Sequence, residues 1–256
     1  MHTQQRLSAL NNIFFEIHSG LPREGPGDNE STKKAYLMLR NLPEEPRVLD
    51  VGCGPGMQTI ALAKLSRGRI IALDNHQQFL DDLKRKAEAE GVSGRIKVVN
   101  GDMCALNFTA KSFDVIWAEG SIFIIGFERG LREWRWLLTD NGYIVVSELS
   151  WLKPDAPEEV KKFFAEAYPP METVEENLEV ARRTGYHVVG WFAIPERGWW
   201  DNYYTPIERK LPALKSKYRG DKNALHILAC EDLEIRMYRK YAEHYGYVFY
   251  VLQAEA

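Results

Sequence analysis

Residues Val48-Leu49-Asp50-Val51-Gly52-Cys53-Gly54-Pro55-Gly56 form the stretch that decides how this chain folds. An apolar run ends in a turn with three alternating glycines, and a helical pattern follows from Met57 to Leu65. This order predicts a strand, a tight loop and the N-terminus of a helix. Such an arrangement lets the backbone approach a nucleotide-like ligand closely.

Apolar runs and helical patterns alternate through the middle of the chain. The predicted strands cover residues 47–51, 69–73, 96–100, 113–118 and 142–147, and the predicted helices cover residues 58–65, 77–89 and 129–138. Strands separated by helices of this length pair in parallel through right-handed crossovers. The sequence therefore predicts an α/β protein with a doubly wound sheet.

The pattern is looser at the two ends of the chain. After residue 148 we expect helices at 156–167 and 174–184, strands at 187–194 and 247–252, and helical, aromatic-rich sequence at 195–246. The N-terminal forty residues are interrupted at 20–27, a run too rich in glycine and proline for helix or strand.

Composition limits the class of protein. The chain has 256 residues, of which 45% are hydrophobic, and a net charge of −3, which suits one α/β domain with a sizeable core. The charge balance argues against a nucleic-acid partner. Cys53, Cys104 and Cys230 show no paired spacing, no metal motif occurs, and no segment reaches the ~20 apolar residues of a membrane span. We therefore expect a cytoplasmic protein without a metal or membrane partner.

Two ligands compete for the glycine loop. A dinucleotide site has a third glycine at the position that Met57 occupies here, where it allows close packing beside a pyrophosphate. Asp50 would repel a pyrophosphate but could hold a positively charged amino group. S-adenosylmethionine (SAM) has such a group, carries a sulfonium and has no phosphate. The loop therefore favours SAM over NAD.

Two further acids follow predicted strands. Asp74 follows the second strand, where a carboxylate can accept hydrogen bonds from ribose hydroxyls. Asp102 follows the third strand, where it can accept the exocyclic amine of adenine while Met103 packs on the ring. Each acid alone could simply cap a helix. Three acids at the carboxyl ends of successive strands, together with the glycine loop, indicate a ligand crevice.

These residues resemble the motifs of the class I SAM-dependent methyltransferases. The similarity extends over about residues 45–150 and includes the first motif at 48–56, the ribose acid Asp74 and the adenine acid at Gly101-Asp102. It also includes the fourth-strand motif at 113–117 and the turn at 137–143, which has Asp140-Asn141 in place of Pro-Gly. Further similarity at 20–27, 118–120, 125–130 and 199–200 is to a small-molecule branch of the family.

The resemblance implies a Rossmann-like, seven-stranded sheet whose last strand is antiparallel, with a helical insertion before that strand. Residues 1–256 would form one domain, with an N-terminal lid at 1–44, a SAM-binding core at 45–150, and an acceptor-side cover with the last two strands at 151–256. The implied cofactor-binding residues are Asp50, Gly52, Cys53, Gly54, Gly56, Asp74, Asn75, Asp102, Met103 and Glu119.

Candidates for catalysis and acceptor binding are less distinctive. Glu119 follows the fourth strand and could act as a general base or orient the cofactor, and His18 lies beside the expected lid. Aromatic residues gather in the segments that should cover the sheet, and they suit a flat or cationic acceptor, although each could equally be core. The candidate acceptor-binding residues are Trp151, Tyr168, Trp199, Trp200 and Tyr203.

The sequence thus predicts an enzyme that transfers a methyl group from SAM to a small-molecule acceptor, as a monomer or homodimer. An NAD-dependent oxidoreductase and a non-catalytic SAM-binding protein are the two alternatives. The identity of the acceptor and of its accepting atom cannot be read from the sequence.

Overall fold

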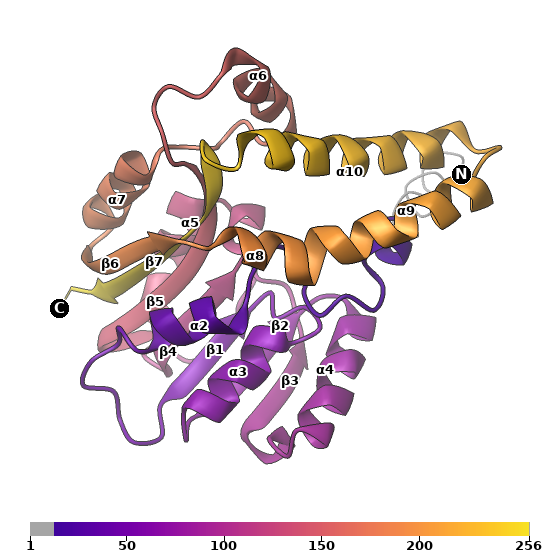
Figure 1. Ribbon diagram of the computed structural model, residues 1–256. Helices are drawn as coiled ribbons and strands as arrows, with labels where there is room; N and C mark the ends of the chain where they lie inside the picture. Colours follow the sequence, from indigo (N-terminus) through magenta and orange to yellow (C-terminus); the bar gives the residue numbers. More distant parts are fainter. Residues whose placement is uncertain (1–12, 256) are drawn as a thin grey trace.

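Seven strands form a single sheet in the order β3-β2-β1-β4-β5-β7-β6 (Figure 1). The computed structural model describes residues 13–255. The strands are β1 (Arg47–Val51), β2 (Arg69–Asp74), β3 (Ile96–Asn100), β4 (Phe113–Glu119), β5 (Leu138–Trp151), β6 (Tyr186–Ala193) and β7 (Tyr245–Ala254). Strands β1 to β5 pair in parallel, and β7 lies antiparallel between β5 and β6. The predicted doubly wound, seven-stranded sheet with an antiparallel last strand is confirmed.

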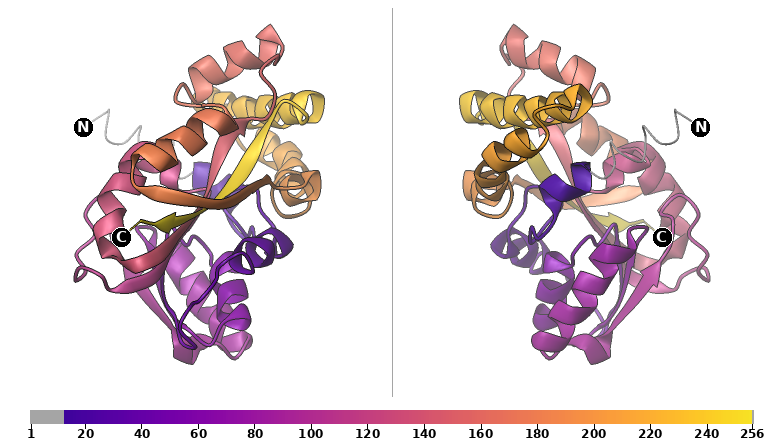
Figure 2. Two further views of the ribbon diagram at one scale, coloured as in Figure 1. Left: turned by 90° about the vertical axis from the view of Figure 1, so that its left-hand side faces the viewer. Right: turned by 90° about the vertical axis from the view of Figure 1, so that its right-hand side faces the viewer.

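Helices cover both faces of this sheet (Figure 2). They are α2 (Asn29–Tyr36), α3 (Met57–Leu65), α4 (Gln77–Ala89), α5 (Phe127–Trp134), α6 (Glu158–Ala167), α7 (Val174–Arg183), α8 (Glu196–Trp199), α9 (Thr205–Lys217) and α10 (Lys222–Tyr241). Residues 13–18 are also helical, and a π-helical turn at Trp200–Tyr204 joins α8 to α9. None of the helices within residues 13–255 combines the length and the apolar character needed to cross a membrane.

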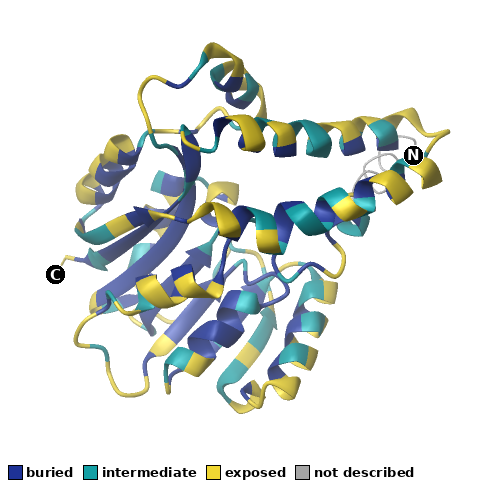
Figure 3. Cartoon of the chain, viewed as in Figure 1, coloured by how far each residue is buried: buried dark blue, intermediate teal, exposed yellow. Residues whose placement is uncertain are grey.

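The central strands are apolar on both faces because helices cover both sides of them. On β1, Val48 faces the cluster that includes α3, whereas Leu49 and Val51 face the cluster that includes α5 and α7. Strand β4 alternates in the same way, with Trp117 on the first face and Ile116 on the second. Buried residues accordingly concentrate in the strands and on the inner sides of the helices (Figure 3).

Polar side chains cap the N-termini of several helices. Asp28 caps α2 by accepting from the backbone N–H of Ser31 at 2.8 Å. At α7, the side chain of Thr173 accepts from the backbone N–H of Glu176, and the Glu176 side chain accepts from the backbone N–H of Thr173, which together form a capping box. Such caps satisfy backbone donors that have no partner within the helix.

Strand β5 is much longer than the predicted 142–147. The turn-forming residues near Asn141, whose φ is 60°, do not end the strand but form a bulge, since the pairing with β4 shifts there. At its other end β5 continues to Trp151 because β7 pairs with it as far as Tyr245. The helix predicted at 129–138 is shorter than expected, and a tight turn at Arg135–Leu137 leads into β5.

The segments outside the central core gather at the carboxyl ends of the parallel strands. Helices α6, α8, α9 and α10 lie on this side, with α9 and α10 in contact with each other (Figure 1). The Gly/Pro-rich run that the sequence places in a lid also lies here, between residues 13–18 and α2. Residues 1–12 of the expected lid lie outside the described residues.

Candidate active site

Three glycines shape the loop between β1 and α3. Gly52, Gly54 and Gly56 have φ values of 73°, 51° and 86°, a backbone region that residues with a Cβ rarely adopt. A Cβ on Gly52 would lie 2.5 Å from the Cβ of Ser121. The loop therefore turns tightly and approaches the segment that follows β4.

The loop is fastened to the end of β2. The backbone N–H groups of Gly52 and Cys53 donate to the carbonyl oxygen of Leu73 at 2.8 and 3.0 Å. Gly54 N donates to Oδ2 of Asp74 at 2.9 Å, and His76 N donates to Oδ1 at 2.8 Å. Each carboxylate oxygen of Asp74 keeps further acceptor capacity. Asp74 thus positions the loop and also borders the space above it.

A cavity of about 500 Å³ opens at the carboxyl ends of the strands. This is where ligands bind in open α/β sheets, and the volume suits a small molecule. Its floor comes from the glycine loop and the ends of β2, β3 and β4, and its cover comes from residues 14–26, α6, the α8–α9 region, α10 and β7.

A buried ion pair fastens the Gly/Pro-rich loop to the sheet. Arg23 donates from Nη1 to Oε2 of Glu119, and both side chains are at most 5% exposed. The other carboxylate oxygen of Glu119 accepts from Thr32 Oγ1 at 2.7 Å and from Trp117 Nε1 at 2.8 Å. Three donors therefore hold Glu119, and Arg23 closes one side of the cavity.

A second ion-paired group connects the helical residues 13–18 to other parts of the cover. His18 is buried, with Nδ1 3.0 Å from Oε2 of Glu24 and Nε2 3.9 Å from Oε1 of Glu231 on α10. Burial alone would lower the pKa of His18, but the two neighbouring carboxylates outweigh it and raise the pKa to about 9. His18 is therefore a cation at neutral pH that holds two cover segments together.

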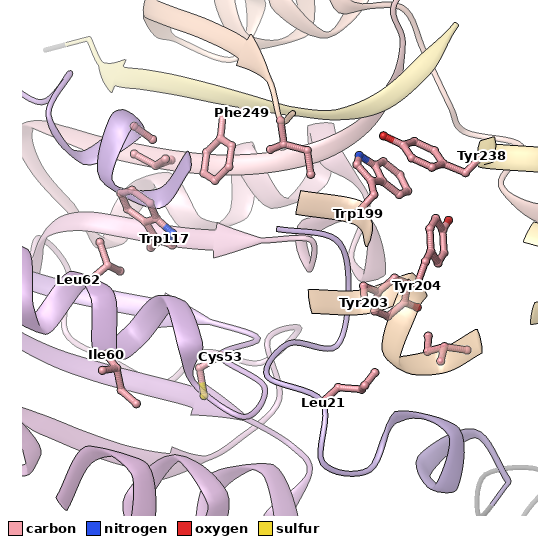
Figure 4. Close-up of a cluster of buried hydrophobic side chains, with 14 of the residues drawn as sticks. Leu21, Cys53, Ile60, Leu62, Trp117, Trp199, Tyr203, Tyr204, Tyr238 and Phe249 are labelled. Carbon is pink, nitrogen blue, oxygen red and sulfur yellow. The ribbon is translucent and has the colours of Figure 1, made fainter. Parts of the chain in front are cut away.

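Aromatic side chains from the C-terminal part of the chain form another wall of the cavity. Trp199 stacks on Tyr238 with ring centroids 4.1 Å apart, and Tyr203 and Tyr204 follow in the π-helical turn (Figure 4). Tyr204 Oη donates to Oε1 of Glu234 at 2.9 Å. Burial raises the pKa of Glu234 to about 7.

Tyr168 brings a further buried carboxylate close to the cavity. Its hydroxyl donates to Oε1 of Glu148 at 2.5 Å, and burial raises the pKa of Glu148 to about 7. Tyr168 lines the cavity, whereas Glu148 lies behind it on β5.

Most of the residues singled out from the sequence border this one cavity. They are His18, Gly52, Cys53, Gly54, Asp74, Asn75, Asp102, Met103, Glu119, Tyr168, Trp199 and Tyr203. Asp102 is exposed, and its Oδ1 accepts from the backbone N–H of Cys104 at 2.8 Å. Segments more than a hundred residues apart in sequence therefore contribute to one site.

Asp50 and Gly56 do not reach the cavity wall. The alternation of β1 turns Asp50 toward α3, where its Oδ2 accepts from Thr59 Oγ1 at 2.5 Å and burial raises its pKa to about 7. A Cβ on Gly56 would lie 2.2 Å from Cδ1 of Leu83, so this glycine permits packing of the loop on α4. Both residues support the loop from beneath.

Trp151 and Trp200 also lie elsewhere than expected. Trp151 is at the end of β5 and packs edge-to-face on Phe164 and Tyr245, beside a separate, smaller hollow. Trp200 packs against Tyr204, with the guanidinium of Arg239 4.8 Å from its ring centroid. Of the adjacent tryptophans, only Trp199 borders the main cavity because consecutive side chains of a helical turn point in different directions.

Several residues of the cavity were not anticipated. Arg23 and Glu24 lie in the Gly/Pro-rich run, Glu234 on α10, and Tyr245 and Tyr247 on β7. A signal exists for Glu234, because it and Glu231 interrupt the apolar pattern of the helix whose buried residues include Leu228, Ile235 and Tyr238. The sequence contains no comparable indication that Arg23 pairs with Glu119.

Within residues 13–255, no group of three or more His, Cys, Asp or Glu side chains is arranged to hold a metal ion. The cations Arg23 and His18 of the cavity pair with carboxylates, in Arg23–Glu119 and His18–Glu24.

Known proteins share this fold. A family profile described as "Methyltransferase domain" matches residues 48–142. A SAM-dependent methyltransferase from Thiobacillus denitrificans, solved in complex with S-adenosyl-L-homocysteine, superimposes with a TM-score of 0.81 at 26% identity, over 95% of this chain and 98% of that one.

Two curated relatives match over shorter stretches. A sterol 24-C-methyltransferase of Aspergillus fumigatus is 32% identical over 45% of this chain and 30% of its own length. A demethylmenaquinone methyltransferase of Lactobacillus johnsonii is 35% identical over 50% of this chain and 48% of its own length. The chain thus spans less than half the length of these two relatives.

Proposed function

Because the chain belongs to the class I SAM-dependent methyltransferases, we propose that it is an enzyme that transfers the methyl group of SAM to a small-molecule acceptor. The match to the methyltransferase profile covers the glycine loop, Asp74 and Asp102, which are the residues that form the floor of the cavity.

The charges of the cavity carry this proposal. Asp74, Asp102 and Glu24 border it near the glycine loop, while its cations, Arg23 and His18, are already paired with carboxylates. A pyrophosphate would meet uncompensated negative charge here, which disfavours an NAD-dependent oxidoreductase. A ligand with an ammonium and a sulfonium group fits, because the neighbouring carboxylates attract both groups.

The residues of the floor divide among the parts of SAM. Asp74 would accept hydrogen bonds from the ribose hydroxyls, with Asn75 beside it. Asp102 and Met103 would hold the adenine. The backbone of Gly52, Cys53 and Gly54 would lie against the methionine portion. When bound, SAM supplies an electrophilic methyl group on a sulfonium.

The rest of the chain aligns the reactants and excludes water. Two side chains hold residues 13–26 over the cavity. Arg23 pairs with Glu119, and His18 pairs with Glu24 and Glu231. A closed, aromatic-walled site favours methyl transfer because orientation and desolvation are the main requirements of such a displacement. Its aromatic wall also argues against a protein that binds SAM without an acceptor.

For Glu119 we favour a positioning role over the role of general base. Arg23 pairs with the charge of this carboxylate, and Arg23, Thr32 and Trp117 together occupy three of its roughly four acceptor sites, which leaves little capacity to take a proton from an acceptor. It is better placed to hold the loop and Arg23 against the end of β4.

We further infer a cytoplasmic protein that acts as a monomer or homodimer and binds neither nucleic acid nor a membrane. The net charge of −3 and the free thiols of Cys53, Cys104 and Cys230 support this inference. Light scattering coupled to size-exclusion chromatography would test the oligomeric state.

The proposed activity is tested by incubating the enzyme with methyl-labelled SAM and a metabolite extract, followed by mass identification of labelled products. We expect at least one labelled small molecule that does not form with heat-inactivated enzyme. Transfer of hydride to or from NAD with an extract component, and no labelled product, would support the oxidoreductase instead. Tight SAM binding without any labelled product would support the non-catalytic protein.

A further inference from the structure

The cavity contains a carboxylate that has no cation beside it. Glu234, on α10, borders the cavity and accepts one hydrogen bond, from Tyr204. No Lys, Arg or His nitrogen within residues 13–255 lies within 4.0 Å of it. His18 lowers the pKa of Glu234 through its charge, but it already pairs with Glu24 and Glu231.

Aromatic rings surround this carboxylate. Tyr203, Tyr204, Trp199, Tyr245 and Tyr247 all border the same cavity. Their mutual packing is close, with the ring centroids of Trp199 and Tyr247 5.5 Å apart and those of Tyr203 and Tyr204 5.3 Å apart. Electron-rich ring faces attract cations, and the attraction is stronger where water is excluded.

Two buried polar atoms at these rings lack partners within the described residues. The hydroxyl of Tyr245 and Nε1 of Trp199 make no hydrogen bond, although the two residues are only 1% and 2% exposed. Buried polar groups are normally satisfied, so these two atoms at a cavity point to a polar ligand. The indole N–H of Trp199 only donates, so it would bind an acceptor atom of the ligand and not its ammonium group. The hydroxyl of Tyr245 can accept a hydrogen bond from an N–H donor.

We propose that the methyl acceptor is an amine, and that its ammonium group binds among these rings against the carboxylate of Glu234. Before transfer, the ammonium gives one proton to this carboxylate, which frees the nitrogen lone pair. The nitrogen–methyl bond then forms as the sulfur–methyl bond of SAM breaks, and S-adenosylhomocysteine is the leaving group. The inference rests on the proposed methyltransferase function and names the class of acceptor for that site. The apolar rings contributed by α6, including Phe163 and Phe164, would contact the carbon skeleton of the amine.

The charge of the site favours an amine over an acidic or a neutral acceptor. A carboxylate or phosphate on the acceptor would be repelled by Glu234, which borders the cavity. A neutral acceptor would leave Glu234 either ionised without a counter-charge or protonated, because its buried position raises its pKa to about 7. Only a cation compensates the carboxylate directly.

Calorimetric titrations with matched probes test the inference in the presence of saturating S-adenosylhomocysteine. The probes are 2-phenylethylamine, 2-phenylethanol and phenylacetate, together with octylamine, octanol and octanoate. We expect each amine to bind about tenfold or more tightly than its alcohol, and the two carboxylates to bind most weakly. Equal or tighter binding of the alcohols or carboxylates, or binding of neither amine, would overturn the inference.

Single substitutions test whether Glu234 and Tyr245 cause the preference for amines. Glu234→Gln keeps the size of the side chain and an acceptor for Tyr204, and it should reduce amine affinity about tenfold without changing alcohol affinity. Asp232→Asn, which removes the same charge from the solvent side of α10, should have no effect. Tyr245→Phe should weaken amine binding about threefold even if Glu234→Gln proves poorly folded. Unchanged amine affinity in both cavity variants would contradict the inference.

The titration with S-adenosylhomocysteine alone distinguishes the two proposals. If that compound does not bind, the proposed function fails. If it binds and the amines show no preference, only the assignment of the acceptor fails.

Discussion

Arg23 lies against Glu119, 96 residues away in sequence, and this buried ion pair attaches the loop before α2 to the end of β4. Thr32, on α2, joins the loop to the strand end, because its hydroxyl accepts from Nη2 of Arg23 at 3.1 Å and donates to Oε1 of Glu119 at 2.7 Å. The pair therefore couples the closure of the cavity to the stability of the sheet.

Breaking this pair should destabilise the protein. Arg23→Ala leaves the Glu119 carboxylate buried without its cation, so we expect the free energy of unfolding to fall by about 3 kcal/mol. Urea unfolding measures this change. As a control, Lys111→Ala removes one partner of the exposed pair Lys111–Asp140 and should cost less than about 1 kcal/mol. Equal losses in the two variants would contradict a structural role for Arg23.

His18 should make stability depend on pH above neutrality. Its pKa is raised from 6.5 to about 9, so the folded protein holds a proton that the unfolded chain loses as the pH rises through 6.5. The stabilisation is therefore complete below pH 6.5 and disappears as the pH approaches 9, a change on the order of 3 kcal/mol.

Comparison with variants isolates this contribution. The difference in unfolding free energy between the native protein and His18→Gln should shrink between pH 6.5 and 9. His187→Gln, a substitution of the exposed histidine on β6, should follow the native pH profile. A constant difference between the native protein and His18→Gln across that range would show that His18 is not held as a cation.

Two glycines with similar backbone angles test the packing of the loop. Gly56→Ala would force a Cβ to 2.2 Å from Leu83, whereas Gly91→Ala meets nothing within 4 Å, and their φ values are 86° and 68°. We expect a loss of about 1 kcal/mol for Gly91→Ala from backbone strain alone and of about 3 kcal/mol for Gly56→Ala. Thermal unfolding checks both values, and similar losses would mean that Leu83 moves aside freely.

The adjacent tryptophans should differ in function. Trp199 borders the cavity and Trp200 does not, so Trp199→Ala should lower methyl transfer to the eventual acceptor at least tenfold. Trp200→Ala should leave the rate per folded molecule nearly unchanged. Rates are compared after the folded fraction is measured, because either change removes a large packed ring. The reverse order of effects would place the acceptor on the other side of α8.

The sequence predicts the sheet well because its signals are local. The apolar run of β1, the three glycines and the acids at the ends of β2 and β3 each depend on neighbouring residues. They lie in the expected strands and turn, although Gly56 packs on α4 and does not border the cavity. The length of β5 could not be predicted in this way. Asn141 resembles a turn residue, but pairing with β4 and β7 makes it part of a bulge within a long strand.

The cover of the site depends on contacts between distant segments, and the sequence carries little trace of them. From the sequence, Asp50 is expected to point toward the ligand because it lies just before the loop. In the folded chain, the alternation of side chains along β1 turns it toward Thr59, beneath the loop. Arg23 finds Glu119, and His18 finds Glu231, only because the folded chain brings these segments together. Glu234 interrupts an otherwise apolar helix pattern, but only the structure shows that it borders a cavity.

The most direct test of the SAM site is calorimetric titration of S-adenosylhomocysteine into the native protein, Asp74→Ala and Asp140→Ala. Asp74 accepts from the glycine loop and borders the cavity, whereas Asp140 is an exposed acid paired with Lys111. We expect micromolar or tighter binding to the native protein and to Asp140→Ala, and at least about tenfold weaker binding to Asp74→Ala, since one lost charge-assisted hydrogen bond costs about 1.5–3 kcal/mol. Absence of binding to the native protein, or equal binding to Asp74→Ala, would contradict the account.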